Sequence, residues 1–168
     1  MTNNGGVLDT PPEDELAAVC ASGDNERVAE LLAFGVDPNS RIGHDSYIAV
    51  AGRAGNHVAL SRLIRAGGKV SRPMLRDAIA GGNPRCADKV LDELHYEGVQ
   101  LELDVEASQL LLERGFAASL TVDMLEWLKR QGVDLAVRSA HGASLYELVQ
   151  RDGGPAEVAT YLQAFHEA

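Results

Sequence analysis

An internal repeat constrains the fold of this chain more than any other feature of its sequence. Residues 16–39 and 48–71 share one order of parts: an Ala-rich apolar stretch, a glycine, an amphipathic stretch, and a second glycine twelve positions after the first. The corresponding glycines of the two segments, Gly23 and Gly55, lie 32 residues apart. A unit of this length cannot bury its own apolar face, so repeats of this kind stack on their neighbours.

Each unit predicts two helices. Val28, Leu31 and Leu32 stand at i, i+3 and i+4, which places them on one face of a helix, and the second unit has matching residues. Small residues in the preceding stretch allow a first helix to pack closely against its neighbours. Gly35 and Gly67 stand where the second helices are expected to end, a position that favours a residue tolerating positive φ.

The pattern continues over three further units, residues 72–98, 104–132 and 138–165. Pro84 suits the opening turn of a helix, where its missing N–H costs nothing. Thr121 is the expected N-cap of another helix.

In the fourth unit, we expect the first helix to extend to Phe116 and Trp127 to pack in the apolar stripe of the second. We therefore predict an all-α chain of about five helix pairs joined by short irregular links. These pairs form a single domain over residues 13–168. Residues 1–12 are expected to be a disordered tail, because Asn, Gly, Thr and Pro bury little apolar surface.

Residues 23–39 (GDNERVAELLAFGVDPN) resemble the ankyrin repeat family, whose corresponding stretch reads G-H-x-x-V-V-x-x-L-L-x-x-G-A-D-x-N. Residues 55–71 are a weaker copy, and residues 125–134 (LEWLKRQGVD) match a fragment of it. Residues 141–148 stand where the family has N-G-x-T-P-L-H-x-A. The resemblance implies an ankyrin-like helical-hairpin solenoid over roughly residues 13–166.

Two departures from the family pattern affect this expectation. The T-P-L-H segment is replaced by residues 46–49 (SYIA) and 144–147 (SLYE), so most hydrogen bonds that Thr and His make between ankyrin repeats are missing. The spacing of corresponding glycines also shortens, to 27 residues between Gly55 and Gly82. Regular hairpin links are therefore not expected around the third and fourth units, and a generic helical-hairpin solenoid is the alternative.

The charge of the chain is unevenly distributed. The net charge of −10 argues against a general binder of nucleic-acid backbones. Residues 41–76 hold seven Arg or Lys and one acid, whereas residues 92–106 hold six acids and neither Arg nor Lys. One interpretation is that both runs are ordinary solvated surfaces. The other is that together they produce an electric field that steers a partner of mixed charge.

No motif in the sequence indicates a catalytic, cofactor or metal site. Nucleotide-binding glycine motifs and the H-E-x-x-H zinc motif are absent, and the five histidines have no metal-ligand spacing with either cysteine. Cys20 and Cys86 are expected to be buried free thiols. With no signal peptide and no apolar run long enough for a membrane span, we expect a cytoplasmic monomer that requires no cofactor.

The resemblance implies a protein-binding module that is not an enzyme, with a partner on the concave first-helix face and the link tips. Tyr and Arg are favoured anchors in such interfaces because they bury a large area. The candidate partner-binding residues lie on the expected first helices and links. They are Arg41, His44, Asp45, Tyr47, Arg53, Arg72, Arg76, Asp77, Arg138, His141, Tyr146 and Arg151.

Within this class, a small acidic chain suits an immunity protein, an antitoxin or an adaptor, and the acidic run over residues 92–106 could neutralise a basic patch on a toxin or nuclease. The alternatives are a host-directed effector, a small enzyme with an unrecognised site, or a structural repeat within a larger complex. The sequence does not identify the partner.

Overall fold

The computed structural model describes residues 11–166, and their fold is all-α, as predicted. Residues 1–10 of the expected tail lie outside this range, and the first helix already begins at Pro12. The helices are α1 (Pro12–Ser22), α2 (Asn25–Phe34), α3 (Tyr47–Arg53), α4 (His57–Arg65), α5 (Arg72–Ala80), α6 (Pro84–Tyr96), α7 (Leu103–Leu111), the 3-10 helix η1 (Phe116–Ser119), α8 (Val122–Arg130), α9 (Leu145–Arg151) and α10 (Ala156–His166). Two short strands, β1 (Arg41–Ile42) and β2 (Asp45–Ser46), form an antiparallel hairpin.

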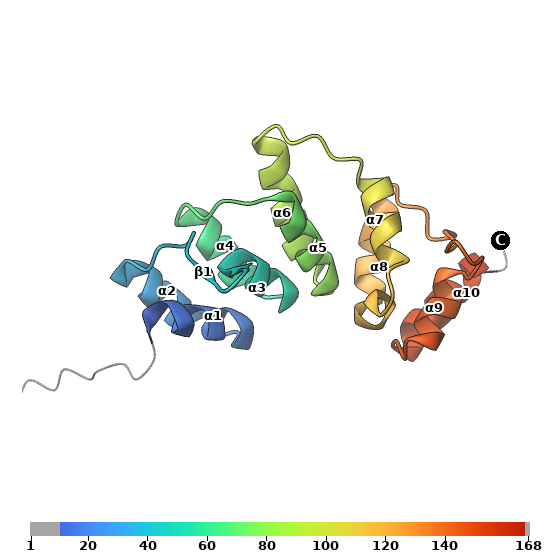
Figure 1. The fold of residues 1–168 in the computed structure, drawn as a ribbon, viewed down its shortest axis with the longest axis horizontal. Coiled ribbons are helices and arrows are strands. Elements are labelled where there is room, and N and C mark those ends of the chain that lie inside the picture. The colour runs from blue at the N-terminus through green and yellow to red at the C-terminus, as the bar shows by residue number, and fades with distance from the viewer. Residues whose placement is uncertain (1–10, 167–168) are drawn as a thin grey trace, which may run out of the picture.

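Consecutive helices pack in pairs, and the pairs follow one another along the molecule (Figure 1). α1 packs on α2, α3 on α4, α5 on α6, and α9 on α10. The first helices α1, α3 and α5 also pack side by side, with the most extensive contact between α3 and α5. Between the third and fourth pairs the packing is thinner and runs mainly from α6 to α8.

One continuous apolar core runs through the pairs. It holds Leu60 of α4, Leu94 of α6 and Trp127 of α8, all essentially inaccessible to solvent, so the prediction for Trp127 is confirmed. Cys20 and Cys86 are buried free thiols, also as predicted. No helix within residues 11–166 is long and apolar enough to cross a membrane.

The N-cap side chain of α4 links the second pair to the first. The side-chain oxygen of Asn56 accepts a hydrogen bond from the backbone N–H of Ala59 (3.1 Å), which satisfies a free donor of the helix end. The amide nitrogen of Asn56 donates to the backbone carbonyl of Cys20 in α1 (3.0 Å). One side chain therefore caps its own helix and ties it to the preceding pair.

The same arrangement recurs at the next two boundaries. Asn83 caps α6 and donates from its amide nitrogen to the carbonyl of Gly55 (2.7 Å). Thr121 caps α8, as predicted, and its hydroxyl donates to the carbonyl of Gly82 (2.9 Å). These bonds form a ladder that we call the N-cap ladder, defined by Asn56, Asn83 and Thr121. It ties α4, α6 and α8 each to the helix pair before it.

A close backbone approach explains the extensive contact between α3 and α5. A Cβ atom added at Gly81 would lie 2.0 Å from the carbonyl oxygen of Gly52, although φ at Gly81 is an ordinary −70°. Only a residue without a side chain fits between these backbones.

The links between pairs differ in structure. β1 and β2 pair Arg41 with Ser46 around a turn that contains Gly43 (φ 60°), and a single bridge joins Arg138 to Ser144 in the last link. The described links over residues 66–71 and 97–102 contain no strand. In the fourth pair, Phe116 lies in η1 and not in the first helix, because α7 ends at Leu111 and Gly115 (φ 80°) redirects the chain.

Candidate functional site

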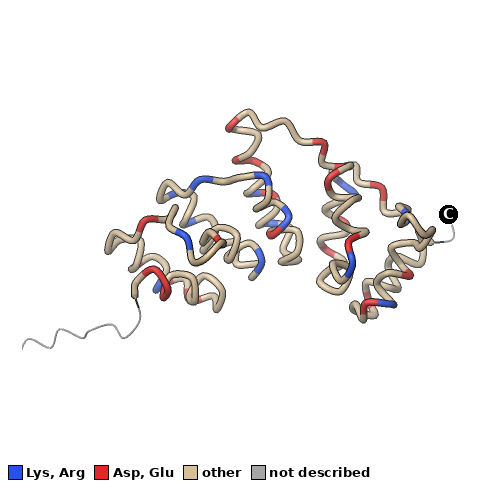
Figure 2. The backbone as a smooth tube through the Cα atoms, in the orientation of Figure 1, with Lys and Arg blue, Asp and Glu red and all other residues tan. Residues whose placement is uncertain are grey.

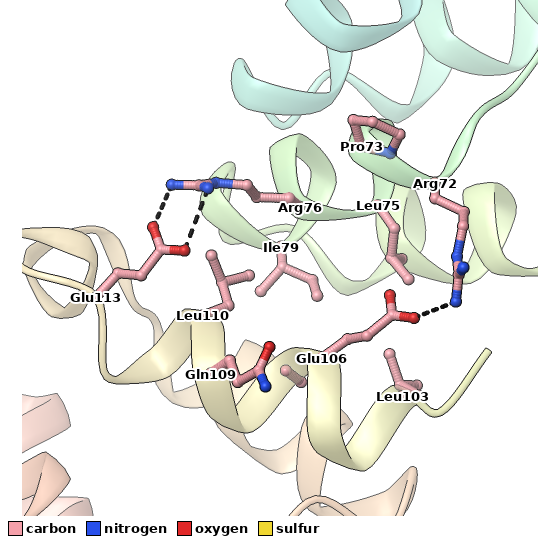
Figure 3. Close-up of a pocket in the computed structure, with 11 residues that line it drawn as sticks. Arg72, Pro73, Leu75, Arg76, Ile79, Leu103, Glu106, Gln109, Leu110 and Glu113 are labelled. Carbon is pink, nitrogen blue, oxygen red and sulfur yellow. Dashed lines mark hydrogen bonds and ion pairs between the residues drawn. The ribbon is translucent and has the colours of Figure 1, made fainter. Parts of the chain in front are cut away.

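A groove of about 220 Å³ lies between α5 and α7, where the third and fourth pairs meet (Figure 3). Leu75 and Ile79 of α5 and Leu103 and Leu110 of α7 line it with apolar side chains. The thin packing at this boundary leaves an apolar seam that a ligand can reach from solvent.

Two ion pairs bridge the groove near its opposite ends (Figure 3). Arg72 pairs with Glu106 (Nη2 to Oε1, 2.5 Å), and Arg76 donates two hydrogen bonds to Glu113, one of them from Nη1 to Oε1 at 3.2 Å. The four side chains remain between 37% and 57% exposed, so water screens both pairs, each worth only about 0–1 kcal/mol. The cationic α5 wall and the anionic α7 wall therefore stay available to a ligand.

Helix periodicity explains why the two arginines face the groove. Arg72 and Arg76 stand at i and i+4 on α5, a spacing that places them on one helix face. Glu106 lies on α7, whereas Glu113 lies in the turn that follows the end of α7. Arg72 and Arg76 were predicted as binding residues, whereas their partners were not. The spacing of the charges could have indicated these partners, because Arg72 and Glu106 lie 34 residues apart and Arg76 and Glu113 lie 37 residues apart, about the length of one repeat.

A second charged cluster lies on α3, α5 and the hairpin. Arg53 pairs with Asp45 of β2 (2.6 Å) and with Asp77 of α5 (3.4 Å). Burial raises the pKa of Asp77 above its usual value, an effect that Arg53 opposes. The structure thus brings together three predicted residues, and Asp77 is adjacent in sequence to Arg76 of the groove.

Tyr47 is the one candidate whose predicted exposure is wrong. Its side chain is fully buried, its hydroxyl has no hydrogen-bond partner, and burial raises its pKa to about 12. As the first residue of α3, Tyr47 packs into the core and is not on the binding surface. Arg41 and His44, by contrast, are exposed on the hairpin.

Arg138 and His141 lie in the last link, well away from the groove in sequence. Arg138 is exposed and donates to the carbonyl oxygens of Gly142 (3.2 Å) and His166 (3.4 Å), which fastens the link to the end of α10. His141 is exposed in the turn of the same link. The link that holds them lies between α8 and the last helix pair, α9 and α10.

Tyr146 and Arg151 are largely engaged within the last pair. The Tyr146 hydroxyl accepts a hydrogen bond from Gln150 (2.7 Å), and Arg151 pairs with Asp152 (2.7 Å). The pKa of Asp152 is held below its usual value first by Arg151 and then by the N–H of Gly115, which bonds to it at 2.8 Å. The bond from Gly115 to Asp152 joins the end of α9 to the turn before η1, and the bonds of Tyr146 and Arg151 stay within α9 and its C-cap.

The groove contains charges of both signs. Its titratable groups are two guanidinium and two carboxylate groups that already pair with each other. Burial raises the pKa of Cys20 and of Cys86 to about 12, so neither is a thiolate at neutral pH. Over the described part of the chain, no three His, Cys, Asp or Glu residues are grouped to hold a metal ion.

Comparisons with known proteins do not assign the chain to a family. No family model matches the chain, and no curated protein matches it.

Proposed function

We propose that this chain is a protein-binding module whose partner contacts the first-helix face at the groove between α5 and α7. The observation that carries the proposal is the groove itself, an apolar seam with cations on one wall and anions on the other. In this proposal the chain acts by binding and uses neither a catalytic centre nor a cofactor.

The size and lining of the groove favour a protein over a small molecule as ligand. Small-molecule sites typically enclose about 300–1,000 Å³, and this groove is smaller and open to solvent. An apolar side chain of a partner fits its floor, while Arg72 and Arg76 supply the residue type that most often anchors protein interfaces.

A stable interface requires more surface than the groove offers. Specific complexes bury about 800 Å² on each partner, so the contact would extend over neighbouring first helices. The cluster of Arg53, Asp45 and Asp77 continues the pattern of alternating charge along this face. We therefore assign Arg53, Arg72, Arg76 and Asp77 to the proposed interface.

We further propose that the helix pairs are degenerate ankyrin-like repeats arranged as a solenoid. Support comes from the serial pairing of helices, from the hairpin between the first two pairs, and from the N-cap ladder, whose bonds repeat at successive boundaries. The ladder offers the inter-repeat hydrogen bonds that the missing T-P-L-H segments would otherwise supply.

Affinity capture with the full chain tests the proposed function. A tagged chain is immobilised, exposed to a lysate of its source cells, and the bound proteins are quantified by mass spectrometry. We expect one stoichiometric partner. Gln109 lines the groove and is exposed, so Gln109→Trp should fill the groove without disturbing the core and reduce capture about tenfold, equivalent to about 1.4 kcal/mol.

The matched control is Gln163→Trp, because Gln163 is also exposed but lies on α10, away from the groove. Its capture should equal that of the unmodified chain. Absence of any stoichiometric partner would overturn the proposed function. Full capture by a folded Gln109→Trp chain would overturn the assigned site.

A further inference from the structure

A second hollow, of about 560 Å³, lies where α6 and α8 end and α7 begins. Leu91 of α6 and Leu101 and Leu103 beside the start of α7 provide its apolar surface. Gln131 and Gly132, which follow α8, complete the opposite side. Leu103 also borders the α5–α7 groove, so the two depressions are neighbours on different sides of the α7 start.

Four carboxylates between the last turns of α6 and the first turn of α7 have no ion-pair partner among residues 11–166: Asp92, Glu97, Glu102 and Asp104. Glu102 and Asp104 line it directly, and the other two lie in or just after the last turns of α6. Figure 2 shows these acidic positions along the outer edge of the molecule, from the end of α6 to the start of α7.

Two of the three helix ends at the hollow add to the negative potential, whereas the N-terminus of α7 carries a partial positive charge that opposes it. α6 ends at Tyr96 and α8 at Arg130, and the free carbonyl groups at a helix C-terminus carry about half a negative charge. Of the basic residues on α6, Lys89 pairs with Glu93, whereas His95 itself lines the hollow. Lys129 lies 5.1 Å from the ring centre of Phe165, and Arg130 lines a separate hollow with Glu126.

An aromatic side chain stands beside the acidic groups. Tyr96 is 88% exposed, an unusual position for so large an apolar group, and it lies at i+4 from Asp92 on the same side of α6. Tyrosine is enriched among residues that dominate binding energy, because its ring buries a large area at little entropic cost.

We propose that this hollow binds a basic, Lys- or Arg-rich polypeptide segment of the partner. An apolar side chain of the segment enters the space between Leu91, Leu101 and Leu103, and its cations face the four carboxylates. Charge complementarity selects this occupant, since the same carboxylates repel nucleic-acid phosphates. The inference rests on the proposed function, and it adds the chemistry of the partner and a second contact surface.

Fluorescence anisotropy of a labelled peptide tests the inference on the full chain. The probe is a Lys-rich peptide with one central Leu, and its counterpart has every Lys replaced by Glu. The test variant combines Asp92→Asn, Glu97→Gln, Glu102→Gln and Asp104→Asn. The unmodified chain should bind only the basic peptide. The variant should bind it about tenfold more weakly, since each exposed pair is worth a factor of about two.

A second four-site variant removes the same charge far from the hollow, through Glu13→Gln, Asp14→Asn, Glu26→Gln and Glu157→Gln, all at exposed positions. Its affinity should change by less than about twofold, because distant exposed charges are screened. An equal loss in both variants would show attraction to net charge alone and overturn the inference. So would failure of the unmodified chain to bind the basic peptide.

The contribution of Tyr96 to binding is tested with two matched substitutions of exposed aromatic residues. Tyr96→Ala should weaken binding of the basic peptide several-fold, whereas Phe34→Ala, which removes a 79% exposed aromatic residue at the end of α2, should leave it unchanged. Equal behaviour of the two would remove Tyr96 from the site. A captured partner that is lost by Gln109→Trp but kept by the four-site test variant would uphold the proposed function and refute the basic-segment inference alone.

Discussion

The N-cap ladder makes a sharp prediction at Asn83. Asparagine and aspartate are equally good N-caps, so Asn83→Asp should preserve the cap of α6. The replacement cannot donate a hydrogen bond at neutral pH, so the carbonyl oxygen of Gly55 loses the partner that now lies 2.7 Å away. The substitution therefore isolates the bond between the second and third helix pairs.

The expected magnitude follows from two opposing effects. Leaving a partly buried acceptor without its donor costs about 1–3 kcal/mol. A negative charge at the N-terminus of α6 returns about 0.3–1 kcal/mol through the helix dipole. The free energy of unfolding should therefore fall by about 1–2 kcal/mol.

Urea unfolding of the two chains measures this difference. It should be followed both by far-ultraviolet circular dichroism and by the fluorescence of Trp127, the single tryptophan, because coincident transitions are needed for a two-state free energy. Asp24→Asn is the matched control. Asp24 caps α2 through the N–H of Arg27 but precedes the ladder, so the reverse exchange should lower stability only by the helix-dipole contribution of its charge, about 0.3–1 kcal/mol. An Asn83→Asp chain as stable as the unmodified one would refute the role assigned to the ladder.

Three further substitutions or reactions test other parts of the structure. Gly81→Ala should lower the free energy of unfolding by at least about 1–3 kcal/mol in a urea titration, because its methyl group must displace the backbone at Gly52; a neutral effect would contradict the close approach of α3 and α5. Tyr47→Phe should leave stability unchanged or raise it by up to about 1 kcal/mol, since the hydroxyl is buried without a partner, and a marked loss in thermal unfolding would reveal a hydrogen bond absent from this structure. Cys20 and Cys86 should resist a thiol reagent at pH 8 and react in urea, because burial raises the pKa of each thiol to about 12 and so keeps it protonated at pH 8. Rapid reaction in the native chain would contradict their burial.

Local features of the fold followed from the sequence where short-range chemistry decides them. α6 begins at Pro84, Thr121 caps α8, and Gly35 (φ 107°) ends α2, all as expected from the preferences of helix termini. Phe116 is the contrasting case, because apolar spacing alone did not show that Gly115 interrupts the fourth unit.

The candidate site was predicted only in part. The exposed arginines of α5 were recognised, because charged residues on a helix face stay in water. Tyr47 was misplaced because a tyrosine at the start of a helix suits either the core or an interface, and only packing distinguishes the two.

What the sequence by itself determined is the helical class of the chain and several helix ends, such as those at Gly35, Pro84 and Thr121, since these depend on contacts within a few residues. The tertiary structure decided which charges meet, where the apolar seam opens, and why Gly81 is a glycine. Arg72 reaches Glu106, 34 residues later, only because the links and the N-cap ladder set the offset and rotation of one helix pair against the next. Those two quantities depend on side chains far apart along the chain, and no local pattern encodes them.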